Sequence, residues 1–196
     1  MRSLGLALAI LILALAATPG RSAATQAWDG AFWGETSRAL LDHFGARATR
    51  LRQPIDFGDS YADVALRGER LGGYAFTLYF QMDKSGGGLK RMQLERGRHG
   101  ANPRVFAAAV RALAAEYGPP AKRCRIDARR ENGYQAASEA LWLRDGNAIR
   151  ATFRDTTLEA SEGCALAAPA ARGACGLTGR LFIRISPDSA QAESCG

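Results

Sequence analysis

The hydrophobic pattern is most regular between Tyr74 and Met82, where large apolar side chains occupy every second position. Side chains of a strand alternate between its two faces, so this spacing predicts a strand with one buried face. Tyr79 lies on the opposite face, among smaller and polar residues. A glycine-rich segment, 83–88, separates this strand from a second extended segment, 89–96, and together they predict a β-hairpin.

Two other segments carry a helical pattern. Residues 103–117 repeat apolar side chains at helical spacing, with Asn102 as a favourable N-cap and Gly118 at the C-terminal end. An earlier stretch, 28–45, carries a similar apolar stripe, and Asp29 is its expected N-cap. We expect both helices to bury their apolar stripes in the core.

Further strands are expected at 55–67, 124–130, 139–144, 148–154 and 181–185. The dipeptide Asp145-Gly146 favours positive φ angles and therefore predicts a tight turn between two of them. Strands grouped in hairpins, without helical crossovers, are typical of antiparallel sheets. The sequence thus predicts an α+β fold in which two helices pack on one face of an antiparallel sheet.

The order of the elements also suggests a tandem αβββ repeat with the last strand appended. The two helices end alike, because Leu40, Phe44 and Gly45 in the first correspond to Leu113, Tyr117 and Gly118 in the second. A repeat of this kind would divide one domain into two similar halves.

The first 24 residues follow a different pattern. Arg2 precedes an apolar run, 4–15, and small residues precede an expected cleavage site after Ala24, with cleavage after Ala16 as the alternative. The run is shorter than the roughly 20 residues that span a bilayer, so a signal peptide is expected rather than a membrane anchor. Residues 25–196 would then form a single periplasmic or secreted domain without a transmembrane segment.

All four cysteines follow this segment, at Cys124, Cys164, Cys175 and Cys195. An even number in an exported chain indicates two disulfides. A zinc site is the alternative, but the chain has no Cys-x-x-Cys spacing and only two histidines. Three pairings are possible. Placing the last strand antiparallel beside 148–154 favours Cys164 with Cys175 and Cys124 with Cys195.

The formal net charge is +7, with 23 Arg and 3 Lys. The coding composition of the source explains such a bias more simply than a binding surface does. Arginine forks nevertheless suit carboxylates and phosphates, so an acidic protein or an anionic envelope component is a possible partner. Export of the chain argues against nucleic acid as a binding partner. The candidate binding residues are Tyr79, Arg91, Arg96 and Arg98.

No catalytic, cofactor or metal site is predicted. His43 and His99 are the residues best suited to acid–base chemistry, but neither lies in a recognised motif, and nucleophile motifs such as Gly-x-Ser-x-Gly are missing. Asp56, Asp59 and Asp63 could supply oxygen ligands for Ca²⁺. Their spacing does not match an EF-hand loop, and turn formation before a strand explains them better.

Helices that end in an aromatic residue and glycine, followed by antiparallel strands, resemble small exported αβ modules such as the beta-lactamase inhibitory proteins and the small outer-membrane assembly lipoproteins. The chain departs from the lipoproteins because it lacks a lipid-attachment cysteine. Segments 57–83 and 117–120 look similar to uncharacterised exported proteins of Gram-negative bacteria, which imply no particular activity. We therefore expect a non-enzymatic binding or accessory module, with a hydrolase or other enzyme that has a dispersed site, or a structural envelope protein, as alternatives.

Overall fold

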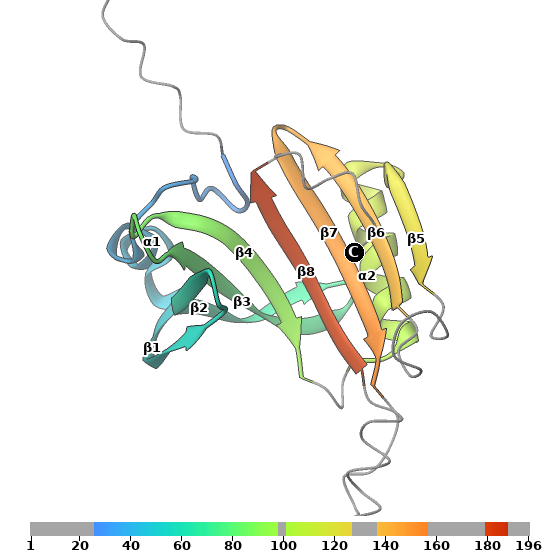
Figure 1. Ribbon diagram of the computed structural model, residues 1–196, viewed down its shortest axis with the longest axis horizontal. Coiled ribbons are helices and arrows are strands. Elements are labelled where there is room, and N and C mark those ends of the chain that lie inside the picture. Colours follow the sequence, from blue (N-terminus) through green and yellow to red (C-terminus); the bar gives the residue numbers. More distant parts are fainter. Residues whose placement is uncertain (1–25, 98–100, 127–136, 157–178, 188–196) are drawn as a thin grey trace, which may run out of the picture.

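The computed structural model describes residues 26–97, 101–126, 137–156 and 179–187. Within these ranges the chain forms one antiparallel sheet of eight strands with two α-helices on one face, which confirms the predicted α+β fold (Figure 1). The elements are α1 (Ser37–Phe44), β1 (Ala48–Asp56), β2 (Ser60–Leu71), β3 (Tyr74–Asp83), β4 (Leu89–Arg96), α2 (Pro103–Tyr117), β5 (Lys122–Ile126), β6 (Ala137–Arg144), β7 (Asn147–Asp155) and β8 (Gly179–Pro187). No helix of this described part is long and apolar enough to cross a membrane.

The hydrophobic core lies between the helices and one face of the sheet. β3 contributes Phe76, Leu78 and Phe80, which the alternating pattern placed on one face and which are buried there. The ring of Phe80 packs against Phe44 of α1, with 5.2 Å between the ring centroids. Leu113 of α2 belongs to the same apolar cluster, so both helices and the sheet share one core.

The first helix is shorter than predicted. α1 begins at Ser37, and Thr36 caps it by accepting a hydrogen bond from the backbone N–H of Ala39 at 3.3 Å. The expected cap, Asp29, is instead a turn residue with a φ of 53°. Positive φ angles at Gly30 and elsewhere in residues 29–34 are incompatible with an α-helix, so the helical stripe in this segment was misleading.

The second helix confirms its prediction at both ends. The side chain of Asn102 accepts a hydrogen bond from the backbone N–H of Val105 at 3.0 Å, and α2 ends at Tyr117 before Gly118. Gly72, in the turn between β2 and β3, lets the backbone approach this helix closely. A Cβ atom at Gly72 would lie 2.6 Å from the carbonyl of Ala108, which is closer than real Cβ contacts.

The segment predicted as one strand at 55–67 belongs to two strands. β1 and β2 pair as an antiparallel hairpin around Gly58, which has a φ of 84°, and the Asp56 carboxylate accepts a hydrogen bond from the Gly58 N–H at 2.7 Å. β1 lies at the sheet edge and is mostly exposed, so it lacks the alternation that marks a half-buried strand. Its absence from the sequence-based prediction follows from this exposure.

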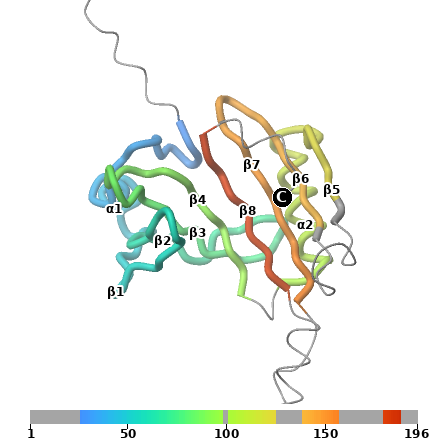
Figure 2. The backbone as a smooth tube through the Cα atoms, viewed as in Figure 1, coloured from blue at the N-terminus to red at the C-terminus, as the bar shows by residue number. Residues whose placement is uncertain are grey.

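The sheet is assembled from two runs of four strands, each preceded by a helix. The strand order is β1-β2-β3-β4-β8-β7-β6-β5, so the first run meets the second where β4 pairs with β8 (Figure 2). The predicted repeat of three strands per helix is not confirmed, because each helix is followed by four. The strand expected as an appendage, β8, is the fourth strand of the second run.

β8 pairs antiparallel with β7, as expected, and the turn between β6 and β7 has positive φ angles at both Asp145 and Gly146. Cys124 lies in β5 opposite Glu139 and is not a free thiol. The three other cysteines, Cys164, Cys175 and Cys195, and the segment 1–24 lie outside the described residues. The disulfide pairings and the signal peptide therefore stay predictions.

Candidate functional site

The face of the sheet opposite the helices carries polar and aromatic side chains in place of a second core. We call it the helix-free face, because α1 and α2, the α-helices of the described part, pack on the other side. In Figure 1, α2 lies behind β6 and β7. The face comprises Thr77, Tyr79 and Gln81 of β3, Arg91, Gln93 and Glu95 of β4, Arg180, Phe182 and Arg184 of β8, Arg150, Thr152 and Arg154 of β7, and Glu139 and Leu141 of β6.

A cross-strand row runs through the middle of this face. The strand register places Tyr79 beside Gln93, Gln93 beside Arg184, Arg184 beside Arg150, and Arg150 beside Leu141. Directly opposed side chains on adjacent strands are close enough to interact. The row therefore brings residues that are up to 105 positions apart in the sequence into one continuous surface.

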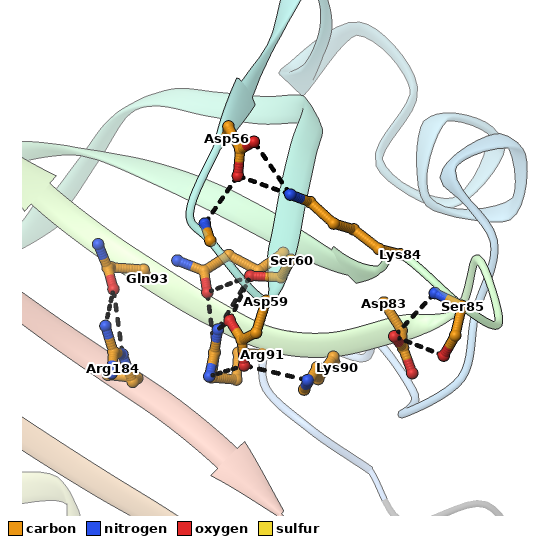
Figure 3. Close-up of polar contacts among 12 residues, drawn as sticks. Asp56, Asp59, Ser60, Asp83, Lys84, Ser85, Lys90, Arg91, Gln93 and Arg184 are labelled. Carbon is orange, nitrogen blue, oxygen red and sulfur yellow. Dashed lines mark hydrogen bonds and ion pairs between the residues drawn. The ribbon is translucent and has the colours of Figure 1, made fainter.

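Arg91 is the centre of a hydrogen-bonded cluster at one end of the face (Figure 3). Its Nη1 donates to Asp59 at 3.0 Å, its Nη2 pairs with the same carboxylate and donates to Ser60 Oγ at 2.9 Å, and its Nε donates to Gln81 Oε1 at 2.8 Å. Hydrogen bonds from Arg91 hold the pKa of Asp59 well below its usual range, and Lys90 at 3.1 Å adds to the effect. The cluster fixes the Arg91 side chain in one orientation.

Gln81 is a fully buried member of this cluster. Its side-chain oxygen accepts hydrogen bonds from Arg91 and Ser60, while its Nε2 is buried and has no hydrogen-bond partner among the described residues. A buried donor without a partner destabilises a fold by about 1–3 kcal/mol. Gln81 therefore marks a position where the face is not arranged for maximum stability.

Arg184 lies in β8, at the centre of the sheet. Its Nε and Nη2 donate to Gln93 Oε1 at 3.1 and 3.0 Å (Figure 3). Its guanidinium lies over the ring of Phe182, 5.6 Å from the centroid. Gln93 is itself buried and donates to Glu95. Burial of Arg184 lowers the pKa of its guanidinium, and the nearby positive charge of Arg91 lowers it further.

Arg150 lies directly opposite Arg184 but has a different environment. Its Nη1 pairs with Glu139 at 2.9 Å, and the same carboxylate accepts a hydrogen bond from Thr152 at 3.3 Å. Glu139 and Thr152 are both buried. Arg150 is thus a compensated charge held in place by its neighbours.

The structure brings two of the four predicted binding residues together. Tyr79 and Arg91 share the helix-free face, where Tyr79 packs on Phe57 with 6.1 Å between the ring centroids. Arg96 does not join them: it lies over the ring of Tyr74 and donates to the backbone oxygen of Ala75 at 2.6 Å. Arg98, the fourth, lies outside the described residues.

Sequence reasoning missed Arg150 and Arg184, the two arginines at the centre of the row. Each occupies the polar position between apolar residues of a strand, as in Ile183-Arg184-Ile185. That alternation was the available signal, since it separates the two faces of β7 and β8. It could not show that the two arginines face each other, because this depends on the strand register.

The residues considered for other chemistry lie apart. His43 packs edge-on against Phe44 with 4.5 Å between the rings, and His99 lies outside the described residues. The candidate calcium ligands form separate ion pairs, Asp56 with Lys84, Asp59 with Arg91 and Asp63 with Arg50. In the described ranges, no group of three or more His, Cys, Asp or Glu side chains is placed to hold a metal ion.

A cavity of about 210 Å³ lies on the helix side of the sheet, over Ile149 and Ile185. Trp28 and Tyr117 contribute to its lining, and burial raises the pKa of the Tyr117 hydroxyl, as does a hydrogen bond with Glu116. The cavity is smaller than the roughly 300–1,000 Å³ that is usual for small-molecule sites. It is therefore a weaker candidate than the helix-free face.

The strongest candidate site is thus a surface formed by β3, β4, β8 and β7, with arginine side chains held by buried amides and carboxylates. Such a surface offers fixed hydrogen-bond donors.

Comparison of the chain with protein-family models, curated proteins and solved structures gave no match.

Proposed function

We propose that this protein is an exported, non-enzymatic binding module that presents the helix-free face of its sheet to a partner protein. One observation carries the proposal: arginine and aromatic side chains meet on this face and are held in fixed positions by their neighbours. Arginine and tyrosine are enriched at protein interfaces and among the residues that dominate binding energy.

The fixed positions matter because ordering a long side chain on binding lowers affinity. Each flexible side chain that becomes immobilised costs about 0.5–1.5 kcal/mol. Arg91 is already held by Asp59 and Gln81, and Arg184 by Gln93 and Phe182. A partner would therefore meet donors that are largely ordered before it binds.

The compartment is part of the proposal. It rests on the pattern of residues 1–24 and on the even number of cysteines, which suit a periplasmic or secreted protein. A relationship to small exported αβ modules belongs to the same proposal. An anionic envelope component is the second candidate occupant of the face, favoured by the same arginines.

The proposal is tested by photo-crosslinking in cells that express the full chain. We would replace Tyr79, on the helix-free face, with a benzoyl-phenylalanine, which is similar in shape. The matched control carries the same group at Arg111, an exposed residue of α2 on the other side of the molecule. We expect a discrete protein adduct from position 79 and none from position 111.

Equal adducts from both positions would indicate collision rather than a docking face and would contradict the proposal. So would the absence of a protein adduct from position 79 while the variant is exported and folded. An adduct that contains lipid or polysaccharide instead of protein would favour the anionic envelope component.

A further inference from the structure

β7 and β8 place arginines directly opposite one another on the helix-free face. Their register pairs Arg150 with Arg184 and Arg154 with Arg180. The intervening residues Ala151 and Ile183 belong to the core, so all four arginines point to the other side. Like charges at directly opposed positions destabilise a sheet. Two such pairs on adjacent inner strands of one sheet therefore need an explanation other than folding.

Negative charge compensates only part of this group. Arg150 pairs with Glu139 at 2.9 Å. Across the described ranges, no carboxylate forms an ion pair with Arg154, Arg180 or Arg184. The three arginines thus form a positive patch on β7 and β8 without an ion pair among the described residues, and only Asp59 and Glu95 act on the charge of Arg184 without pairing with it.

Arg184 is held with one end of its guanidinium unused. Nε and Nη2 both donate to the Oε1 atom of Gln93, and Phe182 supports the flat face of the group. Gln93 is only 4% exposed, so this support is built into the sheet. Nη1 contacts no hydrogen-bond acceptor among the described residues. An arginine held in this way keeps fork donors for an anionic group.

The spacing of the arginines suits an extended ligand. Arg180 and Arg184 are four residues apart on β8, which corresponds to roughly 13 Å along a strand. Side chains four residues apart on an extended polypeptide have the same spacing and point to the same side. Phe182 lies between the two arginines on this face, so an apolar contact lies between the two charged ones.

We propose that Arg154, Arg180 and Arg184 bind the carboxylates of an acidic, extended segment of the partner protein. The inference rests on the function proposed above and names the chemistry of the partner. Arginine forks match the geometry of carboxylates. Phe182, which is partly exposed beside Arg184, adds an apolar surface that a polypeptide side chain can pack against and a purely charged polymer would not use.

The experiment measures binding of a fluorescent peptide with alternating Glu and Thr, long enough to span β8, to the mature protein by anisotropy. The test variant is Arg180→Gln with Arg184→Gln. The control variant, Arg38→Gln with Arg111→Gln, removes the same charge from exposed positions on the two helices. We expect about tenfold weaker binding for the test variant and less than about a twofold change for the control.

A matched Gln-Thr peptide and unchanged melting temperatures of both variants serve as further controls. Equal losses in the test and control variants would show that net charge alone drives binding and would overturn the inference. Tighter, arginine-dependent binding to phosphatidylglycerol vesicles or to polyphosphate than to the Glu-Thr peptide would also overturn it, in favour of a phosphate ligand. Arg180→Lys with Arg184→Lys, which keeps the charge but not the fork, is expected to bind with intermediate affinity.

The two proposals can fail separately. If crosslinking from position 79 captures a partner protein but the Gln variant binds the acidic peptide as well as the native protein does, the carboxylate site is wrong and the binding function stands. If peptide binding depends on the arginines but position 79 gives no protein adduct, the site binds carboxylates and the function in partner binding is wrong.

Discussion

Consecutive residues of β3 show how different the two faces of this sheet are. Phe80 faces the helices, is fully buried and packs on Phe44, while Tyr79 faces the other side and lies half-buried beside Gln93. On the first face, close packing of buried apolar side chains favours folding. On the second, opposed arginines oppose it, as does the buried Gln81 Nε2, which has no hydrogen-bond partner among the described residues. Features that lower stability often mark functional sites, and the proposed binding function would account for them here.

The largest expected effect is on the helix-covered face. Phe80→Ala should lower the free energy of unfolding by about 3–5 kcal/mol, because it removes a fully buried ring and leaves a cavity. Tyr79→Ala, one position away, should cost clearly less, since that ring is only half-buried. Urea denaturation of both variants measures the difference. Equal losses would mean that the two faces contribute alike to stability.

A smaller loss of stability is expected at the N-terminus of α2, which packs on the helix-covered face. Asn102→Ala removes the acceptor for the Val105 N–H and should cost about 0.5–2 kcal/mol. Asn102→Asp and Asn102→Ser keep an acceptor at this position and should retain most of the stability. Thermal denaturation followed by circular dichroism gives the values. A neutral Asn102→Ala would show that packing alone holds this helix.

On the helix-free face we expect a substitution that raises the free energy of unfolding instead of lowering it. Arg180→Gln removes one partner of the opposed pair with Arg154 and should raise the free energy of unfolding by about 0.2–1 kcal/mol at low salt. The gain should shrink as salt screens the repulsion. Arg67→Gln is the control, because Arg67 is exposed and lies opposite Thr77. Destabilisation by Arg180→Gln beyond that control would contradict the argument that the paired arginines oppose folding.

The smallest effect concerns acid stability. Arg91 lowers the pKa of Asp59, so the folded state binds this proton less readily than the unfolded state. The resulting stability is complete above the unfolded pKa of about 4 and is lost as the pH falls towards the folded value. In Asp59→Asn, the free energy of unfolding should therefore fall less steeply with decreasing pH below about pH 4. Between pH 6 and 8 the free energy of unfolding of the variant should depend on pH as it does in the unmodified protein.

Solvent exposure of Asp59 limits the size of this effect. Asp145→Asn is a suitable control, because Asp145 is an exposed turn residue and asparagine tolerates its positive φ. If Asp145→Asn changes the pH dependence of the free energy of unfolding below about pH 4 as much as Asp59→Asn does, the ion pair between Asp59 and Arg91 is not the cause of the change.

The elements that the sequence predicted well are those in which local signals agree. Asn102 with Pro103 defined the start of α2, the alternation of Phe76, Leu78 and Phe80 defined β3, and Asp145-Gly146 defined the turn before β7. β1 was missed because an exposed edge strand shows no alternation, and the start of α1 because an apolar stripe continued through non-helical backbone.

The candidate site was harder to predict for a different reason. Tyr79 and Arg91 come from one hairpin, so local pairing was enough to place them together. Arg184 joins them only because β8 inserts between β4 and β7, and Arg150 joins only through the register of β7 with β8. Strand order and register depend on contacts across the whole sheet, which no local pattern in the sequence specifies.

The central position of β8 has a consequence for how the molecule folds. This strand is the last described element in the chain, yet it fills the gap between β4 and β7 and joins the two runs of strands. Until it is in place, two edges with unpaired backbone groups are open to wrong partners. The contacts of β8 with β4 span about 90 residues, and we expect contacts of such long sequence separation to form slowly. Folding that begins only after β8 has been synthesised would shorten this exposure.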